Sequence, residues 1–132
     1  MHNPRSMSFR NAIRAVSLVA VIAGFAAGCG GATDDRPAKW SFISAAIIEP
    51  SCATASCHSD VARKAGVNLS TKDTGFKALV DRHFVYPNNP GMSEVLFLMR
   101  AQGARRMPPD FSLPEEDIQL ISNWIMAGAQ NN

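Results

Sequence analysis

The sequence predicts an all-α domain of about four helices, and two observations carry this prediction. Apolar side chains recur at helical spacing in four separate segments, and no segment alternates apolar and polar residues for long enough to indicate a strand. The chain has 132 residues, which leaves enough for one domain once the N-terminal region is set aside. We expect this domain to occupy residues 40–132.

The N-terminal region, residues 1–28, is typical of a lipoprotein signal peptide. Arginines form a basic leader, and the uncharged apolar stretch 15–27 that follows is too short for a comfortable membrane span. This stretch ends in Ala-Ala-Gly before Cys29, which resembles the lipobox of bacterial lipoproteins. We therefore expect cleavage before Cys29 and lipid on its sulfur.

An ordinary secretory signal, cut near Gly28 or Gly31, is the alternative, and it would discard Cys29 or leave it as a free thiol. Either signal exports the chain, so we expect it on the periplasmic side of the cell envelope. With lipid attached, the protein is a membrane-anchored lipoprotein whose residues 29–39 form a flexible tether. Gly30 stands where an aspartate would resemble an inner-membrane retention signal, which leaves the outer membrane open as the location.

The charge of the chain gives no argument for nucleic acid as a partner. The formal net charge is +2, but removing the leader arginines Arg5, Arg10 and Arg14 leaves ten Lys/Arg against eleven Asp/Glu. The exported domain is then nearly neutral, so no nucleic-acid partner is expected.

The first two helices are predicted from apolar positions and from the residues that break the pattern. The first helix has one apolar face, and we expect Pro50 to end it. That face is formed by Trp40, Ile43, Ile47 and Ile48. A non-helical stretch with turn residues at 66–69 precedes the second helix, which we expect to run to Arg82. Its apolar residues are Phe76, Leu79 and Val80.

The third and fourth helices have clearer starting signals. The prolines and asparagines of 87–91 break the chain before the third helix, which Ser93 is expected to cap. This helix carries Val95, Leu96, Leu98 and Met99. For the last helix, Ser112 and Glu115 predict a capping box, acidic residues fill the first turn, and Gly128 is expected to end it. Its apolar stripe is formed by Leu120, Ile121, Trp124 and Ile125.

The most informative motif is Cys52-Ala-Thr-Ala-Ser-Cys57-His58, next to the end of the first predicted helix. Two cysteines followed at once by a histidine form the arrangement that attaches haem covalently and supplies an axial ligand to its iron. Four residues separate these cysteines, where the usual C-x-x-C-H signature has two, so the loop must bulge for both sulfurs to reach one porphyrin. We expect one covalent haem c; the wide spacing leaves open whether Cys52 is bonded to it.

Two alternatives remain for the cysteine pair. Once Cys29 is lipidated, Cys52 and Cys57 are the one remaining pair in an oxidising compartment, where a disulfide would close a short loop. A disulfide needs no histidine directly after its second cysteine, whereas haem attachment does. Zinc is a more distant alternative, because the chain has no second C-x-x-C and no partner histidine at ligand spacing. The runner-up function is therefore a haem-free, disulfide-closed helical lipoprotein that acts as a binding module.

A second axial ligand is expected from Met107, in the segment Arg-Arg-Met-Pro-Pro between the third and fourth helices. A thioether is a soft, neutral donor, and two prolines stiffen the loop that presents it. Histidine paired with methionine raises the reduction potential of haem iron, which suits a carrier of single electrons.

His83 is the main rival of Met107, since a second imidazole would give a bis-histidine site of lower potential. Three other methionines compete less strongly. Met99 and Met126 lie in predicted helices, where core packing is their expected role, and Met92 begins one.

These residues together resemble the small monohaem cytochrome c domains of planctomycete and myxobacterial secreted proteins. The resemblance covers about residues 40–129, and its most specific parts are Cys57-His58, Met-Pro-Pro at 107–109 and the terminal Trp124-Ile-x-x-Gly-Ala. Asn88-Asn89 stands where Gly-Asp is usual before the third helix, which concerns only that turn.

The resemblance implies a cytochrome c-like helical domain around a covalent haem. Cys52 and Cys57 would form the thioethers, His58 and Met107 would bind the iron, and the first and last helices would cross. It also implies an electron carrier with redox partner proteins in the envelope. We expect no enzyme, because both axial positions are filled and no catalytic set of residues is present.

Overall fold

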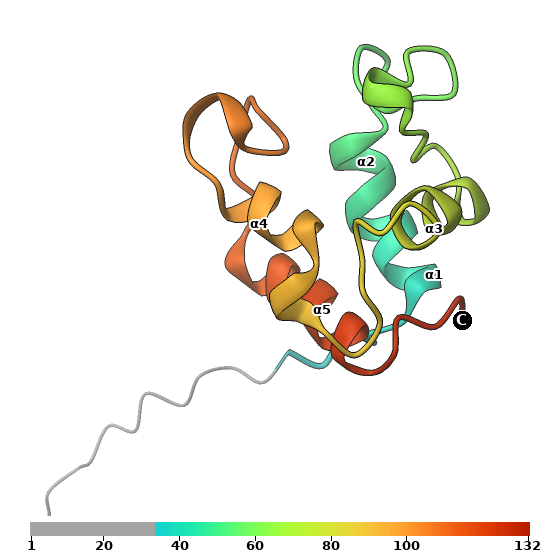
Figure 1. Ribbon diagram of the computed structural model, residues 1–132, viewed down its shortest axis with the longest axis vertical. Helices are drawn as coiled ribbons and strands as arrows, with labels where there is room; N and C mark the ends of the chain where they lie inside the picture. The colour runs from blue at the N-terminus through green and yellow to red at the C-terminus, as the bar shows by residue number, and fades with distance from the viewer. Residues whose placement is uncertain (1–33) are drawn as a thin grey trace, which may run out of the picture. The chain divides into compact units, whose positions relative to one another are not determined.

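The computed structural model describes residues 34–132, so the expected signal peptide and the lipidation of Cys29 lie outside the described range. Within that range the chain is helical and has no strand, which confirms the predicted all-α class (Figure 1). The α-helices of residues 34–132 are α1 (Trp40–Ile43), α2 (Glu49–Cys52), α3 (Lys72–Val80), α4 (Glu94–Arg100) and α5 (Glu115–Met126). None of them is long and apolar enough to cross a membrane.

The first helix continues through Pro50, so the prediction that this proline ends it is wrong. α1, the π-helical segment Ser44–Ile48 and α2 follow one another without interruption up to Cys52. In the π-helical segment the hydrogen bonds span five residues, and the Glu49 N–H donates to the carbonyl of Ser44. This wider turn accommodates the proline, whose ring would meet the carbonyl four residues back in a regular helix. Cys52 is therefore the last residue of a helix.

α3 begins with reciprocal hydrogen bonds between two threonines. The Thr74 N–H donates to the Thr71 hydroxyl, and the Thr71 N–H donates to the Thr74 hydroxyl, both at 3.2 Å. Two otherwise unpaired backbone donors are satisfied in this way. The helix ends at Val80, slightly before the predicted end at Arg82.

The helices that the two predicted serine caps were to start are present, but neither serine makes a cap hydrogen bond. Ser93 occupies the N-cap position of α4, but its buried hydroxyl makes no cap hydrogen bond. Instead it donates to the Asn89 carbonyl and accepts from the Tyr86 N–H, both at 2.9 Å, so it stabilises the preceding turn. Ser112 forms no capping box, because Pro114 is the N-cap residue of α5.

The remaining predictions for α5 are confirmed. Its first turn is acidic, where negative charge is favourable next to the helix N-terminus. At its other end Gly128 has a φ of +97°, a conformation that a residue with a Cβ rarely adopts. The Gly128 N–H donates to the Ile125 carbonyl and the Ala129 N–H to the Trp124 carbonyl. This pair of bonds is a Schellman motif, which closes the helix.

Stacked tryptophans join the first and last helices in the core. The rings of Trp40 and Trp124 have centroids 4.9 Å apart, and Phe76 from α3 packs edge-on against both. Each indole N–H is satisfied: Trp40 donates to the Lys72 carbonyl and Trp124 to the Gln130 carbonyl. α1 and α5 are thus in contact, which is the pairing that the sequence resemblance implied.

The C-terminal residue of the chain caps the first helix. The Trp40 N–H donates to the side-chain oxygen of Asn132 at 3.0 Å, and the Ser41 N–H donates to its main-chain oxygen at 2.8 Å. From this point the first helix continues through α2, which ends at Cys52 and lies farther from the C-terminus than α1 does (Figure 1).

Candidate functional site

A cavity of about 470 Å³ lies where the first helix ends, between the loop that follows Cys52 and the loop that precedes α5. Ligand clefts in proteins typically measure roughly 300–1,000 Å³. Apolar side chains predominate in its lining: Ile48, Ala65, Val67, Leu69, Leu79, Phe84, Val95, Leu98, Met99, Ala104, Pro108 and Pro109. Ser51 and Lys64 are its other lining residues besides the predicted ligand and attachment residues.

The structure brings the four residues predicted for the haem site together. Cys52, Cys57, His58 and Met107 all line this cavity, although Met107 comes from a different loop. His83, the rival ligand, is not among the lining residues. It is exposed, with its ring 5.8 Å from that of Tyr86.

The four residues between the cysteines form a compact turn. The Cys57 N–H donates to the Thr54 carbonyl at 2.9 Å, and the His58 N–H donates to the Cys52 carbonyl at 3.1 Å. The second bond closes the turn from one end of the motif to the other. The wide spacing is therefore compatible with both cysteines facing one cavity.

His58 is held by its backbone and has an unpaired ring nitrogen. Its carbonyl accepts a hydrogen bond from the Leu69 N–H at 2.8 Å, which fixes the main chain at this position. Its Nδ1 atom is buried and has no hydrogen-bond partner among the described residues. Leaving a buried polar atom unpaired costs about 1–3 kcal/mol. A buried nitrogen without a protein partner calls for another partner, such as a water or a bound group.

The two thiols are free and differ in acidity. Burial raises the pKa of the Cys52 thiol to about 11, and the nearby Cys57 adds to this increase. Hydrogen bonds with Thr54 and Ser56 lower the pKa of the Cys57 thiol, and the Lys64 ammonium lowers it further. Cys57 is therefore the thiol that ionises more readily.

Hydrogen bonds fix the loop that contains Met107 on both sides of this residue. The Met107 N–H donates to the Leu98 carbonyl at 2.9 Å, which ties the loop to α4. The Arg106 guanidinium donates to the carbonyls of Pro108 at 3.3 Å and of Pro109 at 3.0 Å. These bonds fix the backbone on either side of the methionine.

Sequence reasoning missed three contributions to the cavity wall. Met99 is packed in the core as expected, but it also faces the cavity, so a second thioether reaches the site. Its spacing of four residues from the lining residue Val95 on α4 is the signal that could have placed it there. Ala65 and Phe84 have no such signal, because their approach depends on how two loops fold against each other.

Within residues 34–132, no group of three or more His, Cys, Asp or Glu side chains is placed to hold a bare metal ion. Comparisons of the chain with protein-family models, with curated proteins and with solved structures give no match. The chemistry of the site is therefore inferred from its own residues.

Proposed function

We propose that this protein is a monohaem c-type cytochrome that carries single electrons in the bacterial cell envelope. The observation that carries the proposal is the shared cavity, in which two thiols, an imidazole and a thioether line one mostly apolar space. Met107 lies far from the Cys52–His58 motif in the sequence, and the fold nevertheless brings it to the same cavity, which supports a common role for these residues.

The residues of the cavity fit a covalent haem. Cys52 and Cys57 have the thiols that form thioether bonds, while His58 and Met107 offer a nitrogen and a sulfur, both of which bind haem iron in known cytochromes. Haem, when bound, supplies an iron that gains and loses one electron. The aliphatic and aromatic walls exclude water, which is one of the means by which a protein sets the potential of such a group.

Electron transfer is favoured over catalysis because His58 and Met107 would occupy both axial positions. An iron that is closed on both faces has no position for a substrate. The proposed partners are therefore other redox proteins of the envelope. Attachment to the membrane through a lipid on Cys29 is a separate part of the proposal.

The proposal is tested with the full chain, expressed with its own signal in a bacterium that attaches haem c. The purified protein should be red, and its haem should survive denaturation and acid-acetone extraction. Mass spectrometry of a digest should find haem on one peptide that contains both Cys52 and Cys57. Haem on Cys57 alone would mean that the wide spacing prevents the second bond.

The matched variants are His58→Ala, which removes the proximal ligand, and His83→Ala, which removes an exposed histidine outside the cavity. The first should lose the low-spin absorption bands, and the second should keep them. A colourless wild-type protein with a disulfide between Cys52 and Cys57 would overturn the proposal in favour of a haem-free binding module.

A further inference from the structure

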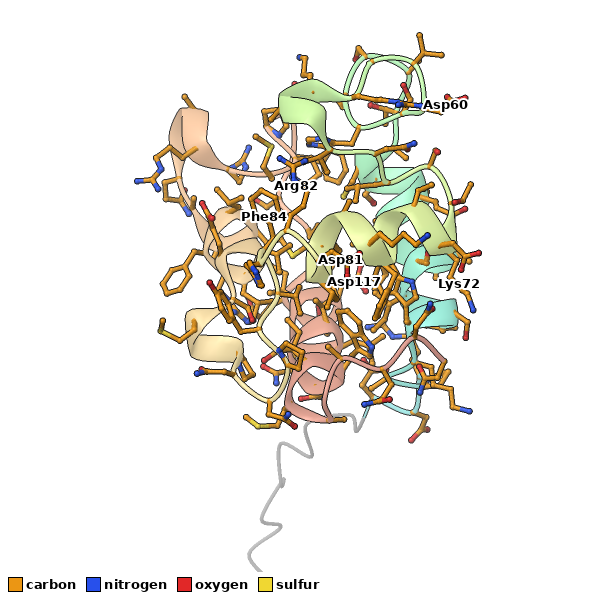
Figure 2. The ribbon with its side chains drawn as sticks, turned by 45° about the vertical axis from the view of Figure 1, so that its right-hand side comes forward. Asp60, Lys72, Asp81, Arg82, Phe84 and Asp117 are labelled. Carbon is orange, nitrogen blue, oxygen red and sulfur yellow. The ribbon has the colours of Figure 1, made fainter. Side chains whose placement is uncertain are left out.

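Arg82 connects two parts of the cavity wall without lining the cavity itself. Its guanidinium donates to the carbonyls of Gly66 at 2.8 Å and of Ala65 at 3.3 Å. The same guanidinium lies over the ring of Phe84, 5.5 Å from the ring centroid (Figure 2). Ala65 and Phe84 both line the cavity. One side chain therefore holds a loop on one side and an aromatic wall residue on the other.

The loop that Arg82 contacts has an unfavourable backbone conformation. Arg63 and Ala65 have φ values of +42° and +54°, in the left-handed region that residues with a Cβ rarely adopt. Such conformations persist only where surrounding contacts enforce them. One such contact comes from the haem motif, since the Lys64 N–H donates to the Cys57 carbonyl at 2.9 Å. Another comes from Arg82, through the two carbonyls that follow Lys64.

We infer that Arg82 is a positioning residue that holds the loop of residues 63–66 against Phe84 and thereby closes this side of the cavity to water. The part of this inference that concerns haem rests on the proposed function, whereas the positioning of the loop does not. The shape of the guanidinium is essential to this role, because its rigid fork reaches two carbonyls while its flat face covers a ring. A lysine at the same position has the charge but not the fork.

The test compares Arg82→Lys and Arg82→Ala with the wild type and with Lys77→Ala, all as matured full-length protein. Lys77 is exposed on the neighbouring α3, so its replacement removes one positive charge without touching the loop. Trypsin cleavage after Arg63 and Lys64 should become about tenfold faster in both Arg82 variants, which is the scale of losing hydrogen bonds to a charged group. Lys77→Ala should cleave at the wild-type rate.

Cleavage after Arg100, far from this loop in the sequence, separates positioning from general loss of stability. A loosened domain would be cut faster at all sites, whereas loss of the Arg82 contacts should accelerate cleavage only after Arg63 and Lys64. If Arg82→Ala does not fold, the cleavage rates of Arg82→Lys alone test the inference. Wild-type cleavage in Arg82→Lys, or an equal acceleration after Arg100, would overturn the inference.

The reduction potential supplies the second measurement. Water that enters beside the haem should lower the potential in Arg82→Lys as well as in Arg82→Ala, because burial is one of the determinants of haem potential. Lys77→Ala should keep the wild-type potential. If Arg82→Lys also kept the wild-type potential, the positive charge alone would matter, and the inference would be overturned. A wild-type protein without haem would defeat the proposed function, and the cleavage rates would then decide the role of Arg82 by themselves.

Discussion

Two methionine side chains reach the cavity, and they differ in burial and in setting. Met99 is 4 % exposed and belongs to the core cluster, whereas Met107 is 38 % exposed and lies in a loop fixed by hydrogen bonds on both sides. A sulfur that already fills core space is costly to withdraw, since removing packing atoms leaves a void. Of the two, Met107 is therefore the better candidate for the proposed iron ligand.

Replacing Met107 with alanine should remove the weak charge-transfer band that a thioether–iron bond gives near the red end of the spectrum. The reduction potential should fall as well, because the soft sulfur favours the ferrous state. Met99→Leu, which conserves volume, and His83→Ala should leave both properties unchanged. Loss of the band in Met99→Leu instead would assign the bond to the buried methionine.

The difference between the two thiols gives a prediction for protein produced without haem. At neutral pH, iodoacetamide should modify Cys57 before Cys52, because the thiolate is the reactive form and only Cys57 has a lowered pKa. The preference should shrink as the pH rises toward 11, where Cys52 ionises too. Peptide mass spectrometry measures both rates.

Ser56→Ala is the matched control for this prediction, because it removes one hydrogen bond that lowers the Cys57 pKa. In this variant the rate of modification should be lower at Cys57 and unchanged at Cys52. Equal rates for the two thiols in the wild type at neutral pH would contradict the assigned environments.

At the scale of the elements, the packing of α3 on the first helix leaves little room for a side chain at one position of α3. Gly75 is buried in α3, and a Cβ at this position would lie 3.2 Å from a ring carbon of Trp40. Trp40 is itself fully buried and stacked on Trp124, so it has little room to move.

Gly75→Ala should therefore destabilise the domain, although alanine is the better helix former by about 1 kcal/mol. Overpacking of a core costs typically about 1–3 kcal/mol, so the net loss should reach about 1 kcal/mol in the free energy of unfolding. Denaturant unfolding measures it, with Lys77→Ala as a surface control in the same helix. A more stable Gly75→Ala variant would show that the tryptophan pair shifts easily.

The helices were predictable from sequence because apolar periodicity records which face is buried, and burial decides where a helix forms. Their boundaries were less predictable, because local groups compete for the same partners. Ser93 has a cap position and yet bonds to the turn before it, and Pro50 is tolerated inside a helix because a π-helical turn precedes it. Neither outcome is visible in a pattern of residue types.

The candidate site, too, was predictable from sequence only in part. Cys52, Cys57 and His58 are neighbours in sequence, so their motif predicts a common role, and Met107 carries its own Met-Pro-Pro signal. Met99 was assigned to packing, since nothing in its helix pattern distinguishes a core wall from a cavity wall. No sequence pattern indicates a cavity role for Arg82, because its contacts depend on the path of a loop with left-handed residues.

At the scale of the whole described domain, charge is unevenly distributed. The loops 53–71 and 101–112 both contribute to the cavity lining. These loops and Arg82 contain five of the ten Lys/Arg of residues 34–132, but only two of the eleven Asp/Glu. The rest of this range has five basic residues against nine acidic ones. The side chains of these two loops and Arg82 thus carry a net positive charge and the remainder a net negative one, which would favour the approach of an acidic partner to these loops.

Electron exchange with a small anionic reagent such as hexacyanoferrate(III) should therefore slow as salt is added, because salt screens attraction beyond about 10 Å at 0.1 M. Arg105→Glu, at an exposed position in the loop before Met107, should lower the low-salt rate by about twofold or more. Lys39→Glu makes the same change just before α1 and should have little effect. A rate that rises with salt for the anion would contradict this charge arrangement.

The start of α1, which Asn132 caps, lies at the opposite end of the first helix from the cavity residue Cys52. At the α-helical rise of about 1.5 Å per residue, Trp40 and Cys52 at the two ends of this helix are separated by up to about 18 Å. A linker joined ahead of Trp40 therefore attaches at the base of that helix, well away from the cavity mouth. On an electrode coated through such a linker, the adsorbed layer should present its cavity mouths to the solution, where soluble partners can compete for them.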